Sequence, residues 1–78
     1  MSRWKRPLDA REVRTILRNL GFEYRNTSGS HEQWVKEGPP FRKVTVDPPK
    51  QPFSHTLIRF MASQAGVTVR EFYDALGD

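Results

Sequence analysis

A chain of 78 residues without a single cysteine must be held together by packing alone. A domain of this size buries only roughly 60% of the surface that its unfolded chain exposes, and no disulfide can supplement its core. We therefore expect one domain over residues 1–78, with residues 1–7 as a basic N-terminal arm. The missing cysteines also leave only His31 and His55 as soft metal ligands, so we expect neither a metal site nor a cofactor.

Membrane insertion is not indicated by the sequence. No apolar run approaches the roughly 20 residues needed to span a bilayer, and the N-terminal residues lack the apolar middle of a signal peptide. We expect a soluble, cytoplasmic protein without a membrane partner.

The charge is unevenly distributed along the chain. There are 13 Lys and Arg residues against 9 Asp and Glu, which gives a net charge of +4 and an isoelectric point near 10. The whole excess lies within residues 1–18, while the middle of the chain carries further basic residues. Such a domain favours a polyanionic partner through long-range attraction and counterion release. The alternative is that the charge only keeps a small protein in solution.

Local signals predict three helices. Asp9 is an N-cap with Glu12 as its capping-box partner, and Thr68 repeats the arrangement with Glu71. Apolar residues recur at helical spacing after each start, and glycines follow the first two helices. The basic residues Arg11, Arg14 and Arg18 fall on another face of the first helix and predict a solvated stripe. The helices are expected between Asp9 and Gly21, between Ser54 and Gly66, and from Thr68 to Leu76.

Three extended segments lie between the first two helices. We expect strands at Phe22–Asn26, His31–Lys36 and Phe41–Val46, separated by turns rich in glycine, serine and proline. A proline-rich crossover over residues 47–53 then returns the chain across the sheet. The neighbours Trp34 and Val35 cannot both face one side, so the pattern leaves the register open. The predicted fold is α+β, in the order α-β-β-β-α-α, with a three-stranded antiparallel sheet and the helices on one face.

Most enzyme motifs are absent, and the one chemical candidate is Gly29-Ser30-His31. An imidazole transfers protons near neutral pH, and cleavage of RNA beside a 2′-hydroxyl requires proton transfer and stabilisation of phosphorane charge. Turn N–H groups and nearby cations would supply that stabilisation. On these features alone, a surface histidine on a strand is more often a spectator.

The order of several segments resembles the HicA toxin family. The matching segments are Leu20-Gly21-Phe22, Ser28 to Trp34, Val44-Thr45-Val46, Thr56 to Arg59, Gln64 to Val67, and Glu71-Phe72. Members of that family are small bacterial mRNA interferases whose fold is similar to double-stranded RNA-binding domains, and a HicB antitoxin inhibits them. The resemblance implies that His31 is catalytic, that mRNA is the substrate and that a HicB-like antitoxin is the partner. The proline-rich crossover and the basic arm depart from the family pattern and put the substrate contacts in doubt.

Several residues beside His31 are candidates for RNA binding, each with a plainer alternative. Trp34 is either a stacking residue or part of the core, with the core favoured, and the same choice holds for Trp4. His55, at the start of the second expected helix, is either a neutral structural residue or a second catalytic acid, with the former favoured. About half of the cations are expected to be ordinary solubilising charges. The candidate RNA-binding residues are Gly29, Ser30, Arg25, Lys36, Arg42, Lys43 and Lys50.

Three functions remain open, and the third of them is an interaction protein whose open sheet face and helices are covered by a partner. The leading one is a metal-independent endoribonuclease toxin that uses a single histidine. The alternative is a non-catalytic RNA-binding module of the same fold, because such a fold supports shape-based RNA contact as readily as cleavage.

Overall fold

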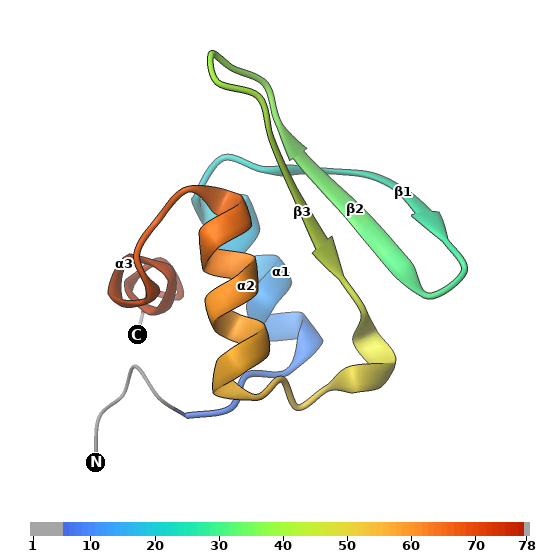
Figure 1. The fold of residues 1–78 in the computed structure, drawn as a ribbon, viewed down its shortest axis with the longest axis vertical. Helices are drawn as coiled ribbons and strands as arrows, with labels where there is room; N and C mark the ends of the chain where they lie inside the picture. The colour runs from blue at the N-terminus through green and yellow to red at the C-terminus, as the bar shows by residue number, and fades with distance from the viewer. Residues whose placement is uncertain (1–5, 78) are drawn as a thin grey trace.

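The computed structural model describes residues 6–77 and has the expected element order (Figure 1). Helix α1 and helix α2 lie on one face of a three-stranded antiparallel sheet, and the short α3 packs on α2. The predicted fold class is therefore confirmed. The elements are α1 (Ala10–Asn19), β1 (Glu23–Ser28), β2 (His31–Lys36), β3 (Arg42–Val46), the 3-10 helix η2 (Pro48–Lys50), α2 (His55–Ala65) and α3 (Val69–Asp74).

Side-chain caps fix the starts of the helices. The Asp9 carboxylate accepts the Glu12 N–H at 2.8 Å, and the Glu12 carboxylate accepts the Asp9 N–H at 3.0 Å. Thr68 and Glu71 form the same reciprocal pair at the start of α3. Helix α1 is followed by Gly21, whose φ of +94° lies in the left-handed region that glycine adopts without steric cost.

The sheet has the strand order β1-β2-β3, and its register places Trp34 opposite both Tyr24 and Val44. The first strand runs to Ser28 rather than stopping at Asn26, because a bulge at Arg25 shifts the register and lets pairing continue to the turn. Phe22 lies before this strand and is buried in the core.

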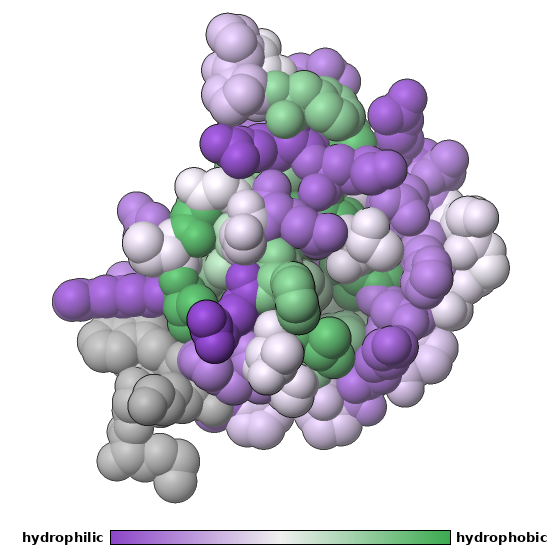
Figure 2. Space-filling view, viewed as in Figure 1, coloured by the Kyte–Doolittle hydropathy of each residue, from purple (hydrophilic) through white to green (hydrophobic). Residues whose placement is uncertain are grey.

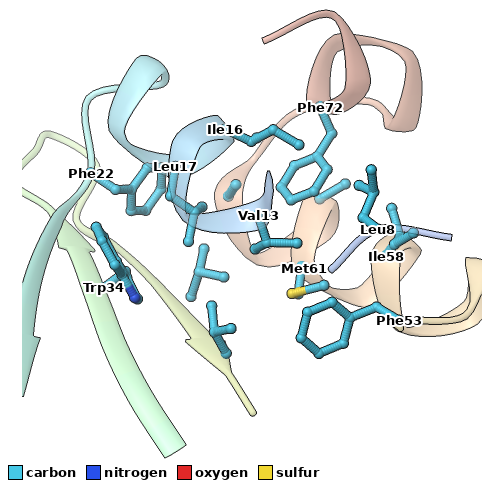
Figure 3. Close-up of a cluster of buried hydrophobic side chains, with 14 of the residues drawn as sticks. Leu8, Val13, Ile16, Leu17, Phe22, Trp34, Phe53, Ile58, Met61 and Phe72 are labelled. Atoms are coloured by element: carbon cyan, nitrogen blue, oxygen red, sulfur yellow. The ribbon is translucent and has the colours of Figure 1, made fainter. Parts of the chain in front are cut away.

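The core fills the space between the sheet and the helices (Figure 3). Trp34 is 2% exposed and turns toward the helices, whereas its neighbour Val35 is only half-buried. Burial of the larger ring therefore selects the register that the sequence pattern left open. The largest fully buried side chains are Phe53, Phe72, Leu8, Ile16, Leu17, Ile58, Val13, Val44 and Val46.

The segment before α1 is tied to the crossover and to α3. The Phe53 N–H donates to the Leu8 carbonyl at 2.7 Å. The Tyr73 hydroxyl donates to the Arg6 carbonyl, and the Arg6 guanidinium lies 3.0 Å from the Glu12 carboxylate. Arg6 thus belongs to the folded domain rather than to a separate arm. The remaining basic residues of the predicted arm, and Trp4, fall within residues 1–5, outside the described residues.

The predicted solvated stripe on α1 is confirmed for Arg11 and Arg18, which are exposed, but is wrong for Arg14, which is half-buried; both Arg14 and Arg18 make contacts with β2. Arg14 donates two hydrogen bonds to the Glu32 carboxylate, at 3.0 and 2.6 Å. Arg18 lies over the Trp34 ring, 5.2 Å from its centroid. These arginines face the sheet because β2 places an acid and an aromatic ring within reach of α1, a relation that helical spacing alone does not reveal.

Candidate functional site

The turn between β1 and β2 places the candidate histidine, His31, at the first position of β2 and at the end of the sheet. Ser28 pairs with His31, so only Gly29 and Ser30 form the turn. Gly29 has a φ of +62°, and Ser30 does not adopt a positive φ. A glycine with positive φ at the first of two turn residues is the pattern of a type II′ hairpin, which matches the twist of the strands.

His31 lies beside the carboxylate of Asp47, the residue that directly follows β3. Its Nε2 is 3.4 Å from Asp47 Oδ2, and the Ser30 hydroxyl donates to Asp47 Oδ1 at 2.7 Å. The Asp47 side chain is 19% exposed, while that of His31 is 56% exposed. One carboxylate thus accepts a hydrogen bond from the turn and lies beside the ring, and the ring remains open to solvent.

Strand register explains how residues 16 positions apart meet. Glu32 pairs with Val46, so the next pair toward the turn is His31 with Asp47. Side chains alternate along a strand, and Trp34 and Val46 face the helices, which turns His31 and Asp47 toward the other face. Asp47 was not among the site residues predicted from the sequence. The sequence places Asp47 directly after the alternating Val44-Thr45-Val46 strand. Its contact with His31 can be predicted only if the register between β2 and β3 is known.

The arrangement is suited to proton transfer. A neutral imidazole has one donor and one acceptor nitrogen, and a carboxylate at Nε2 favours the proton on that nitrogen. The Nδ1 atom is then the acceptor, available to a group that approaches from solvent. A protonated ring would form an ion pair with Asp47 over the same distance.

Of the predicted RNA-binding residues, Ser30, Gly29 and Lys50 lie at this end of the sheet. The Lys50 N–H donates to the Asp47 carbonyl at 2.9 Å, because η2 begins directly after Asp47. Arg25 is exposed at the bulge of β1. Lys43 is exposed opposite Val35, on the sheet face that the helices leave open.

Lys36 and Arg42 lie at the other end of the strands, paired with each other across β2 and β3 (Figure 1). Lys36 lies five residue steps along the extended strand from His31, about 17 Å of chain. The Lys36 ammonium lies 6.0 Å from the Phe22 ring centroid. Arg42 lies over Gly66, where an added Cβ would come within 2.7 Å of its guanidinium carbon. A cation at the C-terminal end of α2 also interacts favourably with the helix dipole.

The two remaining candidates occupy other parts of the fold. Trp34 is buried, and its indole N–H donates to Glu32 at 3.1 Å, so its place is in the core rather than on an RNA surface. His55 is half-buried at the first position of α2, well apart from the β1–β2 turn in Figure 1. Its Nδ1 is buried without a hydrogen-bond partner.

A family comparison bears directly on this site. The model of the HicA toxin of bacterial toxin–antitoxin systems matches residues 10–67, from α1 through the end of α2. The chain belongs to the HicA toxin family. As a HicA toxin, it is the toxin component of a bacterial toxin–antitoxin system, and its partner in that system is an antitoxin. Comparisons with curated proteins and with solved structures gave no significant match.

The match to the HicA family includes His31, Asp47 and Lys50, but not the residues before α1 or helix α3. Within residues 6–77, no three histidine, aspartate or glutamate side chains lie close enough to share a metal ion. Over the same part of the chain, none of the helices has the length and apolar character required to cross a bilayer.

A second carboxylate lies close to the site but faces the helices. The Arg14 hydrogen bonds hold the pKa of Glu32 below its ordinary value, against the opposing effect of burial, and the Trp34 N–H adds to the lowering. The same hydrogen bond raises the pKa of Arg14. Glu32 therefore stays charged as part of the packing between α1 and β2.

Proposed function

We propose that this HicA toxin is a metal-independent endoribonuclease that cleaves mRNA, with His31 as the proton-transfer group. The observation that carries the proposal is an exposed imidazole held beside a carboxylate at the sheet end of a basic domain. A proton-transfer group with one nitrogen oriented and the other open is what acid–base catalysis of RNA cleavage requires. Since mRNA is the proposed substrate, we propose the bacterial cytoplasm as its site of action.

The proposed reaction needs no group beyond the RNA and the protein. His31 Nδ1 accepts the proton of a 2′-hydroxyl while the 2′-oxygen forms a bond to the adjacent phosphorus. The bond from phosphorus to the 5′-oxygen breaks, and the imidazolium returns its proton to that leaving oxygen. The products are a 2′,3′-cyclic phosphate and a 5′-hydroxyl end. Asp47 acts here as a positioning residue that orients the ring.

Charge on the phosphorane would be stabilised by cations and turn N–H groups near His31. Lys50 hydrogen-bonds to the Asp47 carbonyl through its backbone N–H, and the Gly29-Ser30 turn, which directly precedes His31, is proposed to supply the backbone N–H groups. Arg25 and Lys43 are exposed and are proposed to hold neighbouring phosphates. Lys36 and Arg42 already make contacts within the fold, so we assign them a smaller part in RNA binding.

Inhibition is proposed to come from a HicB-like antitoxin that covers His31. The ring is 56% exposed, so a partner can reach it without rearrangement of the domain. Acidic side chains would suit the basic surroundings and would speed association at low salt. In a purified complex, a histidine-modifying reagent should react with His31 far more slowly than in the free toxin. An equal rate would rule out inhibition by covering.

The experiment that tests the nuclease uses two RNAs that differ at one atom. An RNA that the protein cleaves at one position is compared with the same RNA carrying a single 2′-deoxynucleotide there, both in EDTA. We expect cleavage of the first, with a cyclic phosphate end, and none of the second at that position. Loss of cleavage in EDTA with recovery in Mg²⁺, or cleavage at the deoxynucleotide, would contradict the proposed chemistry.

The second candidate function is an RNA-binding module without cleavage. The open sheet face favours it, because Lys43 lies there beside polar side chains such as Gln33 and Thr45, which hydrogen-bond to each other at 3.0 Å. RNA that binds tightly and remains intact after long incubation would support this alternative.

A further inference from the structure

Phe60 in the middle of α2 is the most exposed large apolar side chain of the described residues, at 64%. Tyr24 and Phe41 follow, at 53% and 51%, and Tyr24 has a ring partner in Trp34. Phe60 is outside the core, although the neighbouring Met61 and Ala62 are buried. A helix that packs on a sheet normally exposes polar residues on its outer side. An exposed phenylalanine at such a position is typical of a binding surface.

Phe60 lines two hollows of the surface. One, of about 310 Å³, is shared with Thr56, Arg59 and Ser63 of α2. The other, of about 170 Å³, lies between α2 and the end of β3, with Asp47, Lys50 and Gln64 among its walls. Figure 2 shows apolar side chains at the surface in this region, bordered by hydrophilic ones. The ring therefore has open space beside it and cations close by.

The second hollow shares one residue, Asp47, with the candidate active site. Asp47 is at once a wall of this hollow and the residue that lies 3.4 Å from His31 Nε2. Lys50, the proposed phosphate contact, is another wall. An RNA strand that runs from His31 past Asp47 and around the end of β3 would place a neighbouring nucleotide at this hollow.

We propose that the second hollow binds a nucleobase of single-stranded RNA, which stacks on Phe60, while Lys50 of this hollow and Arg59 of the adjoining first hollow hold the flanking phosphates. This inference rests on the nuclease proposed above and adds to it a subsite for a nucleotide next to the cleaved bond. Stacking on an exposed aromatic ring flanked by cations is the common way in which proteins bind unpaired bases.

Gln64 supplies a polar contact suited to a base. Its side-chain oxygen accepts the Thr45 N–H of the edge strand at 3.2 Å, which fixes the orientation of the amide. The amide nitrogen is then the donor at this wall, and a base carbonyl or ring nitrogen is a matching acceptor. A purely apolar occupant would leave this donor and Lys50 unmatched, which favours a base over an apolar segment of a protein.

The test measures binding in the His31→Ala background, where RNA stays intact. Parent, Phe60→Ala, Phe60→Trp and Phe41→Ala forms are titrated with a short single-stranded RNA and, separately, with polyphosphate, which has charge but no bases. Phe41 is the matched control, an exposed phenylalanine between β2 and β3, away from the hollow (Figure 1). Thermal melting confirms that each form is folded.

We expect Phe60→Ala to weaken RNA binding between about fivefold and about a hundredfold, the range for loss of one stacked base. Phe60→Trp and Phe41→Ala should bind RNA like the parent, and all forms should bind polyphosphate alike. Equal RNA affinity of Phe60→Ala and the parent would overturn the base subsite and leave the nuclease intact. If Phe60→Ala binds RNA like the parent but binds the antitoxin more weakly, Phe60 belongs to the antitoxin interface and the base subsite is overturned. A parent that neither binds nor cleaves RNA would remove both proposals.

Discussion

Glu32 and Asp47 are two carboxylates at the same end of the sheet and on opposite faces, Glu32 in β2 and Asp47 directly after β3. Glu32 faces the helices, where Arg14 and the Trp34 N–H occupy it, and its side chain is 14% exposed. Asp47 faces away and contacts Ser30 and His31, with 19% exposure. Burial is nearly the same, so exposure does not distinguish them. Their partners do: one holds two elements of the fold together, and the other holds an exposed imidazole.

The largest expected effect is that of His31→Ala, which removes the partner of Asp47. We expect RNA cleavage to fall by roughly 10²- to 10⁴-fold, the usual contribution of an acid–base group. The melting temperature should barely change, because the side chain is 56% exposed. His55→Ala is the matched control and should retain cleavage. Equal cleavage by His31→Ala and the parent would remove His31 from the mechanism.

Asp47→Asn keeps the shape of the side chain and removes its charge. Cleavage should fall by about 10- to 100-fold, because the ring loses its orientation and its charged partner. The Ser30 hydroxyl still has an oxygen to bond, so stability should change by less than about 1 kcal/mol. The measurement is a single-turnover cleavage rate with a melting curve. A drop in cleavage that is matched by unfolding would make Asp47 a structural residue like Glu32.

Glu32→Gln should have the opposite profile. At pH 7 the free energy of unfolding should fall by about 2 kcal/mol, the cost of weakening a hydrogen bond between charged groups. The rate per folded molecule should stay within about twofold of the parent, since the substituted side chain would still face the helices, away from His31.

The pH dependence of Glu32 sharpens this prediction. Its pKa is lowered on folding, so its charge stabilises the native state above the ordinary glutamate value, and this contribution disappears as pH falls through the lowered pKa. The stability difference between the parent and Glu32→Gln should therefore shrink in acid. A difference that is constant from pH 7 to about pH 3 would show that the ion pair is not its origin.

The smallest effects separate Arg42 from Lys43. Lys43→Ala should weaken RNA binding for every sequence alike and lower the slope of log affinity against log salt by about 0.7 to 1. Arg42→Ala should instead lower stability by about 0.5 kcal/mol, because the guanidinium lies at the C-terminal end of α2. Equal salt slopes for Lys43→Ala and the parent would make Lys43 a solubilising charge.

The sequence predicted what depends on near neighbours along the chain. Asp9 with Glu12 and Thr68 with Glu71 are three residues apart, and both capping boxes are present. The helix order, the strands and the Gly29-Ser30 turn follow from similarly local signals.

The contacts that distinguish the two carboxylates are not local. Asp47 meets His31 only because burial of Trp34 selects one register, which alternation alone could not choose. Arg14 meets Glu32 only once α1 packs on the sheet. A charge count therefore found the basic character of the domain but could not say that Arg14, Arg18, Lys36 and Arg42 make contacts within the fold.

The division of roles between Asp47 and Glu32 is tested most directly by ¹⁵N NMR of the His31 ring, recorded above about pH 8, where histidine is ordinarily neutral. In the parent, we expect the proton on Nε2, the nitrogen that faces Asp47. Asp47→Asn should shift the tautomer population toward Nδ1–H, and Glu32→Gln should leave it unchanged. A His31 ring with the same tautomer population in the parent and in Asp47→Asn would contradict the assignment of Asp47 to the histidine.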